Sequence, residues 1–255
     1  MNTDHAILTP DWPAPPTIRA AVTTRGMGGH SRAPFDACNL GSRCGDAAAA
    51  VAANRAEVAA ALELPTPPRW LHQVHGVDVF DADAAMASAS EPQADAAIAR
   101  GVSVVLAVLT ADCLPILLCA EDGSAIAVAH AGWRGLASGV IEATIVRLGV
   151  PGARLLAWLG PAIAAGSYEV GAEVRAAFVD AHPSAAAAFA PTRPGHWRCD
   201  LYALARQRLA AAGVSSVYGG DFDTCTDARF YSYRRDRETG RFASLIWRVA
   251  IPRSV

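Results

Sequence analysis

Cys113 and His130 are the two side chains whose types and positions best suit metal chemistry. They border two short apolar runs, residues 114–120 and 125–129, which are joined by the tetrapeptide Glu-Asp-Gly-Ser and so predict a β-hairpin. If the hairpin pairs the residues that flank its turn, Cys113 lies opposite Gly132, and His130 is its diagonal neighbour on the same face of the sheet. A thiolate and an imidazole at adjacent strand ends can share a zinc ion, whose bonds to sulfur and nitrogen are about 2.0–2.3 Å long.

A third ligand is needed, because a catalytic zinc site has three protein ligands and one open coordination position. His72 and His75 of the segment LHQVHG are the nearest upstream candidates. Residues three apart in a strand point to opposite faces, so only one of these histidines can reach the metal. The residues alone do not decide which one, and the wide spacing of the candidate ligands matches no short metal-binding motif.

Asp112 interrupts an apolar run beside Cys113, and a buried carboxylate is costly unless it has a partner. We therefore expect Asp112 to serve the site, either as a proton shuttle or by orienting a histidine ligand. The same residues permit a thiol hydrolase, with Cys113 as nucleophile and His130 or His75 as its base. A binding protein with a purely structural metal is a further alternative, which a closed fourth coordination position would favour.

The elements that must position these residues follow from apolar periodicity and turn residues. Residues 101–120 are mostly apolar, but Asp112 and Pro115 lie among them, and an aspartate deep in a bilayer costs roughly 2.5–3.5 kcal/mol. Two buried strands are therefore expected there, and no membrane span. The other expected elements are strands at 18–24, 155–159 and 244–249, helices at 46–64 (with Asp46 as N-cap), 136–148, 171–181 and 201–212, two strands within 70–80 that turn at Gly76, and a loop or irregular helix at 81–99.

The composition bounds the class of protein. The chain has 255 residues, of which 52% are apolar and 18% charged, and this suits a single α/β domain with a large core. A formal net charge of −2 offers no basic excess for a nucleic-acid backbone, so no nucleic-acid partner is expected. No secretory pattern occurs near the N-terminus, and the six scattered cysteines include no CxxC pair, so we expect reduced thiols in the cytoplasm.

Eight segments of the sequence carry a resemblance to the YfiH family of bacterial proteins. They span nearly the whole chain, from about Ala21 to Ile246, and TADCLP with HAGWRG is the most specific combination among them. The glycine-rich segment is one residue longer than the family's usual TRxGG pattern. In chain order the segments are TTRGMGG, CNLGSRCGD, LHQVHG, TADCLPILL, AHAGWRG, LGPAI, YEVG and FYSYRRDRETGR.

The resemblance implies a fold and a set of ligands. The fold is a mixed α/β (α+β) arrangement of sheets flanked by helices, as one domain over residues 1–255 with its motifs within about 18–249. The second histidine of LHQVHG corresponds to the family's metal ligand, so the implied ligands are His75, Cys113 and His130. The implied metal is zinc, with copper as an alternative.

The resemblance also implies an activity. Members of the family are described as phosphorylases of adenosine, inosine and S-methyl-5′-thioadenosine that also deaminate adenosine. The expected partners are therefore a purine nucleoside and phosphate, with no membrane and no obligate protein partner. Residues in family motifs that are expected to contact substrate or phosphate are Arg25, Asn39, Arg134, Tyr231 and Arg235.

Two other labels used for the family imply different chemistry. One is a peptidoglycan editing hydrolase that acts on muropeptide precursors. The other is a copper-dependent polyphenol oxidase resembling laccases. A multicopper site of the known kind needs several histidine clusters with His-x-His pairs, whereas this chain has seven histidines and no such pair. The laccase label therefore fits the residues poorly.

Overall fold

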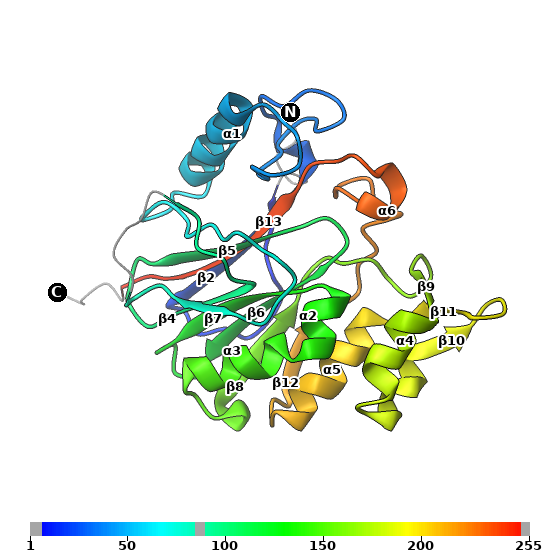
Figure 1. Cartoon of the computed structure of the whole chain (residues 1–255). Coiled ribbons are helices and arrows are strands. Elements are labelled where there is room, and N and C mark those ends of the chain that lie inside the picture. Colours follow the sequence, from blue (N-terminus) through cyan, green and yellow to red (C-terminus); the bar gives the residue numbers. More distant parts are fainter. Residues whose placement is uncertain (1–6, 85–89, 251–255) are drawn as a thin grey trace.

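Two β-sheets pack face to face, and helices cover their two outer faces (Figure 1). The computed structural model describes residues 7–84 and 90–250. The layers run from α1 (Ala48–Ala61) through a four-stranded sheet and a six-stranded sheet to a group of helices on the far side. This is the single mixed α/β unit, with sheets flanked by helices, that the sequence predicted.

The six-stranded sheet has the predicted hairpin at its centre. Every residue of β6 (Leu114–Ala120) and β7 (Ile126–Ala131) is buried, which explains why both sequences are continuously apolar. The two strands are antiparallel with Leu114 opposite Ala131, so the register continues to Cys113 opposite Gly132, as predicted. In spatial order the strands are β12 (Ser216–Gly219), β8 (Leu155–Leu159), β6, β7, β4 (Ala96–Ala99) and β3 (Val79–Asp81).

In the four-stranded sheet, a strand from the end of the chain lies between two strands from its first half. β13 (Phe242–Arg248) pairs antiparallel with β2 (Ile18–Thr23) on one side and with β5 (Val105–Thr110) on the other. β1 (Ile7–Leu8) completes the edge beside β2. A separate small sheet consists of β10 (Phe189–Pro191), β11 (His196–Cys199) and β9 (Glu169–Gly171).

Alternate residues of β6 supply both faces of the core. Leu117 packs between the sheets with Leu106 and Ile246, whereas Leu118 faces helices and packs with Ile141. Removal of this apolar area from water drives the sheets and helices together, at about 25 cal/mol per Å². The remaining helices are α2 (Trp133–Ser138), α3 (Val140–Leu148), α4 (Ala172–Val179), α5 (Leu201–Ala211) and α6 (Tyr233–Asp236), with short 3-10 helices η2 (Arg25–Met27), η3 (Gly152–Arg154) and η4 (Pro183–Ala188).

Most of the predicted elements are present, with their ends shifted by a few residues. The strands expected at 18–24, 155–159 and 244–249 correspond to β2, β8 and β13, and the helices expected at 171–181 and 201–212 correspond to α4 and α5. The apolar stretch 101–120 forms β5 and β6, the two buried strands expected in place of a membrane span. Within the described residues, no helix is long and apolar enough to cross a membrane.

Two helix predictions were wrong in detail. The segment 136–148 is interrupted at Gly139, whose φ of +97° ends α2 and begins α3, a conformation that glycine adopts without steric cost. Asp46 is not the N-cap of α1, because Ala47 holds that position without a capping side chain. The Asp46 carboxylate accepts hydrogen bonds from Ser31 Oγ at 2.6 Å and Asn39 Nδ2 at 2.9 Å instead.

The prediction for residues 70–99 was also partly wrong. The first of the two strands expected within 70–80 is absent, and only isolated bridges at Arg69 and His72 occur there. The segment expected to be loop or irregular helix contains β4, which lies in the six-stranded sheet between β7 and β3. Ile98 is the only β-branched residue of this alanine-rich strand, so the pattern that usually indicates a strand is weak there. Residues 85–89 of that segment lie outside the described residues.

Candidate metal centre

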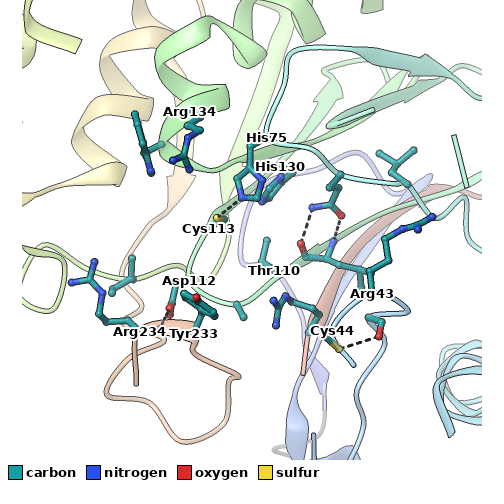
Figure 2. A pocket seen from close by; sticks show the side chains of 18 of the residues that line it. Arg43, Cys44, His75, Thr110, Asp112, Cys113, His130, Arg134, Tyr233 and Arg234 are labelled. Atoms are coloured by element: carbon teal, nitrogen blue, oxygen red, sulfur yellow. Dashed lines mark hydrogen bonds between the residues drawn. The ribbon is translucent and has the colours of Figure 1, made fainter. Parts of the chain in front are cut away.

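Three side chains meet at one end of the six-stranded sheet, and they are those implied as metal ligands. Cys113 directly precedes β6, His130 lies near the end of β7, and His75 lies in the loop before β3 (Figure 2). One donor atom from each of the three lies within 4.8 Å of the other two. His72 is not in this group, and its backbone N–H donates to the carbonyl oxygen of Pro92. The structure therefore brings together the set that includes His75.

The donor geometry fits a single metal ion. The Sγ of Cys113 lies 3.8 Å from the Nε2 of His75. A tetrahedral ion with bonds of about 2.0–2.3 Å holds its ligand atoms roughly 3.5 Å apart, so little movement is needed. Gly132 leaves the space beside them, since a Cβ there would lie 2.7 Å from His75 Cδ2 and 3.0 Å from Cys113 Sγ. Two nitrogens and one sulfur suit zinc or copper, and they leave a further coordination position for a small ligand.

The charge state of the cysteine also suits metal binding. Burial alone would raise the pKa of the Cys113 thiol, but His130 and His75 lower it to about 6. Burial alone would lower the pKa of the His130 imidazole, but Cys113 and Asp95 raise it to about 9. The thiolate that results is the form that binds a cation or attacks an electrophile.

Asp95 was missed by the sequence reasoning. It directly precedes β4 and is completely buried, and its Oδ1 lies 2.8 Å from the Nδ1 of His130. This contact leaves the Nε2 of His130 for the metal. The only hint in the sequence was a single carboxylate in an alanine-rich stretch, and the strand that follows it was not predicted.

A cavity of about 540 Å³ opens onto the three donors. Figure 2 shows Arg134 and Arg234 on one side of Cys113 and Arg43 on the other. Arg43 forms an ion pair with Glu91, but within the described residues the other arginines that line the cavity form none. Arginines elsewhere often pair with a carboxylate. Two carboxylates, Glu91 and Asp112, also line the cavity, so its wall keeps an excess of positive charge that attracts an anion. The arginines that line the cavity are Arg43, Arg134, Arg234, Arg237 and Arg241.

Aromatic rings hold two of these arginines in place. The guanidinium carbon of Arg134 lies 4.4 Å from the ring centroid of Trp133, and that of Arg234 lies 5.1 Å from the ring of Tyr168. Stacking on a ring restrains the side chain and leaves the N–H donors pointing outward in the plane of the guanidinium. One of the Arg234 donors, on Nη1, is used by the carbonyl oxygen of Glu169 at 3.0 Å. Tyr233 also lines the cavity and is 52% exposed, so its ring face is available to a ligand.

Asp112 lines the same cavity, but its carboxylate already has two partners. Its Oδ1 accepts from Thr224 Oγ1 at 2.7 Å, and its Oδ2 accepts from the backbone N–H of Arg234 at 2.6 Å. Asp112 has a φ of +92°, a left-handed conformation that aspartate tolerates better than most residues. These contacts tie the segment that carries Arg234 to the residue beside Cys113, and they favour a positioning role over proton transfer.

The other residues expected to contact substrate do not line the cavity. Tyr231 is fully buried, and its hydroxyl donates to the carbonyl oxygen of Phe35. Asn39 is buried, and its Oδ1 accepts from the backbone N–H of Arg241 at 2.8 Å. Arg25 pairs with Asp36 at 3.3 Å. Of the predicted contact residues, Arg134 alone lies in the wall.

Arg235, a predicted contact residue, does not line the cavity. It neighbours Arg234 in α6, but successive residues of a helix point about 100° apart, so only one of the two enters the cavity wall. The Arg235 guanidinium donates to the carbonyl oxygens of Thr224 at 3.1 Å and Phe230 at 2.9 Å, and it pairs with Asp236 at 2.8 Å. Its donors are used within the protein, which indicates a structural role.

Comparison with known proteins gives consistent relatives. Residues 19–249 match the family model described as multi-copper polyphenol oxidoreductase laccase. A purine nucleoside phosphorylase of Pseudomonas aeruginosa is 54% identical over 95% of this chain and 98% of its own length. The purine nucleoside phosphorylase YfiH of Escherichia coli K12 is 46% identical over 95% of this chain and 99% of its own length.

Solved structures share the whole fold. A Neisseria meningitidis protein superposes with a TM-score of 0.92 at 46% identity, covering 96% of this chain and all of that one. A Bacillus licheniformis protein named YfiH superposes with a TM-score of 0.83 at 30% identity, covering 90% of this chain and 92% of that one. The layered arrangement of sheets and helices is therefore common to all three proteins.

Proposed function

Because this chain belongs to the YfiH family, we propose that it is a zinc-dependent purine nucleoside phosphorylase that acts on adenosine, inosine and S-methyl-5′-thioadenosine and also deaminates adenosine. The observation that carries the proposal is that the three metal donors and the unpaired arginines line one cavity. A phosphorylase needs both an anion site and a centre that acts on the nucleoside. The relatives named purine nucleoside phosphorylase support the same reading.

Arg134 and Arg234 are the proposed phosphate ligands. They lie on the same side of Cys113, and within the described residues neither has a carboxylate partner (Figure 2). Their aromatic supports at Trp133 and Tyr168 hold the guanidinium planes, so less conformational entropy is lost when phosphate binds. Each charge-assisted hydrogen bond to phosphate contributes about 1.5–3 kcal/mol.

The proposed reaction exchanges one bond for another at the ribose. An oxygen of hydrogen phosphate bonds to C1′, the bond between C1′ and N9 of the purine breaks, and the base leaves with the proton that the phosphate releases. Tyr233 offers its exposed ring to the flat base, and the arginines hold phosphate on the facing side. Zinc, when bound by His75, Cys113 and His130, would supply a Lewis acid with one open position.

Asp112 organises this arrangement in the proposal. Its carboxylate holds the backbone of Arg234 while its neighbour Cys113 faces the metal position. The anion site and the metal centre are thereby held at a fixed separation. We propose that the reaction takes place in the cytoplasm, since all six cysteines are free thiols, and that it needs no obligate protein partner.

A thiol hydrolase remains the second candidate, because one observation favours it. The Cys113 thiol has a pKa lowered to about 6, and the imidazole of His75 lies 3.8 Å away, which is also the arrangement of a cysteine nucleophile and its base. A multicopper oxidase is less favoured, since the described residues contain one group of three donors that could hold a metal. The peptidoglycan editing reaction rests on a family label alone.

Product analysis tests the proposal. The zinc-loaded protein is incubated with adenosine, with and without phosphate, and the products are separated by chromatography. We expect adenine and ribose 1-phosphate only when phosphate is present, and slow formation of inosine in both cases. Adenine release that does not depend on phosphate concentration would contradict phosphorolysis.

The arginine assignment has a matched control within the chain. Arg134→Gln should raise the KM for phosphate about tenfold or more, because one charge-assisted hydrogen bond is lost, and should leave deamination nearly unchanged. Arg175 also stacks on a tryptophan, with its guanidinium carbon 5.3 Å from the ring of Trp197, but it does not line the cavity. Arg175→Gln should leave the phosphate KM unchanged. Equal effects of both substitutions would refute the assignment.

A further inference from the structure

The carboxylate of Asp95 accepts hydrogen bonds from several groups that belong to, or flank, two of the candidate metal ligands. Besides the ring of His130, its two oxygens accept from the backbone N–H groups of Val74 at 3.1 Å, His75 at 2.9 Å and Gly76 at 2.7 Å. The side chain is completely buried.

The three backbone contacts shape the loop that carries His75. His75 has a φ of +63°, a left-handed conformation that costs a residue with a side chain about 1–2 kcal/mol. Three successive amides converge on one carboxylate, and these charge-assisted bonds offset that cost. The conformation directs the His75 ring toward Cys113, whose Sγ lies 3.8 Å from the His75 Nε2.

The fourth contact sets the orientation of His130. In β4 and β7, Ala96 lies opposite Ala129, so Asp95 lies opposite His130 at the next position of the same register. The backbone N–H of His130 donates to the Asp95 carbonyl oxygen at 2.7 Å, while its ring faces the Asp95 carboxylate. The carboxylate thus favours a proton on Nδ1 and leaves a lone pair on Nε2.

We propose that Asp95 is a positioning residue that sets two of the three metal ligands at once, so that one carboxylate controls the metal affinity of the centre. Its carboxylate holds the loop of His75 by binding backbone N–H groups of that loop, and it holds His130 by binding the imidazole ring. The inference rests on the zinc centre of the proposed function and does not depend on the reaction assigned to it. Among the described residues no hydrogen bond joins Cys113 to Asp95, and the β6–β7 register places Cys113 instead.

Zinc affinity of an Asp95→Asn variant tests this role. The amide keeps the size of the side chain but replaces one acceptor oxygen with a donor that opposes the backbone N–H groups. We expect the dissociation constant for zinc, measured by competition with a chromophoric chelator and no nucleoside present, to rise about 10–100-fold. Circular dichroism should show that the variant is folded.

Asp223→Asn is the matched control. The Asp223 carboxylate also accepts several bonds, from Ser167 Oγ at 2.5 Å and from the backbone N–H groups of Cys225 at 3.1 Å and Ala164 at 3.3 Å, but it contacts no candidate ligand. Both variants should lose thermal stability, and only Asp95→Asn should lose zinc affinity. Equal zinc affinity in Asp95→Asn and the unaltered protein would overturn the proposal, whichever reaction the enzyme performs.

A measurement on the unaltered protein covers the case in which Asp95→Asn does not fold. Long-range ¹H–¹⁵N NMR of the zinc-loaded protein distinguishes the two ring nitrogens of His130. We expect the proton on Nδ1 and the metal on Nε2. Zinc on Nδ1 would break the contact with Asp95 and would refute the positioning role directly. Absence of zinc binding by the unaltered protein would instead refute the metal centre itself.

Discussion

Gly132→Ala should disable the metal centre through a single added methyl group. The backbone of Gly132 has a φ of −63° and a ψ of 159°, which alanine adopts freely, so no backbone strain is expected. The new Cβ, however, would lie 2.7 Å from His75 Cδ2 and 3.0 Å from Cys113 Sγ. The effect of the substitution is therefore confined to two of the three candidate ligands.

The magnitude follows from how far the ligands must move. Ordinary contacts of a Cβ begin at about 3.4 Å, so the ring of His75 must retreat by about 0.7 Å. Metal–ligand distances in proteins vary by only about 0.2 Å, so this displacement exceeds the tolerance of the centre. We expect zinc affinity to fall on the order of 100-fold, which corresponds to about 2.7 kcal/mol. Because His75 is exposed in the loop, the metal-free protein should melt at nearly its normal temperature.

Chelator competition gives the dissociation constant for zinc, and thermal denaturation of the metal-free protein gives the stability. Gly166→Ala is the control, since its added Cβ would meet only Arg198 Nη1, at 3.8 Å. It should change neither quantity. Normal zinc affinity in Gly132→Ala would show that His75 or Cys113 does not bind the metal from the position seen here, and the ligand assignment would fail.

Two further predictions concern the same cavity. Without metal, the alkylation rate of Cys113 should rise with pH through about 6, because the thiolate is in excess above its lowered pKa. Bound zinc should slow the alkylation until a chelator is added. Peptide mapping by mass spectrometry measures both rates. Rapid alkylation of the zinc-loaded protein, with loss of activity in step, would support the thiol hydrolase. Asp112→Asn removes one oxygen that accepts a hydrogen bond from Thr224 or Arg234. It should therefore raise the KM for phosphate and lower the free energy of unfolding by about 1–3 kcal/mol, while the affinity for zinc is retained. An unchanged phosphate KM with a large drop in the rates of both reactions would point back to Asp112 as a proton shuttle.

The hairpin was predictable because its determinants are local. A four-residue turn with Gly123, whose φ is +72°, fixes the register of β6 and β7. Once the register is known, Cys113 and His130 must lie near each other. The pair of candidate ligands that share this hairpin could therefore be found from the residues alone.

The third candidate ligand could not be found in this way. The alternation argument for His72 and His75 assumed a strand, but His75 lies in a loop whose left-handed residue is held by Asp95, some twenty positions away. Long-range contacts of this kind leave no periodic pattern in the sequence. For the same reason the sequence could not indicate which of Arg234 and Arg235 faces the cavity, since that depends on the docking of α6 through Asp112.

The central place of β13 in the four-stranded sheet has a consequence for synthesis of the chain. Ile246 pairs with Ala20 on one side and Leu106 on the other, so neither neighbour can complete its ladder before the ribosome has made β13. At about 5–20 residues per second, roughly 6–23 s separate His130 from Ile246. The nascent protein thus has all three candidate ligands well before Arg234 and Arg241, while the edges of β2 and β5 await their partner. Unpaired strand edges invite association with other chains, so we expect emerging chains to depend on chaperone protection during this interval.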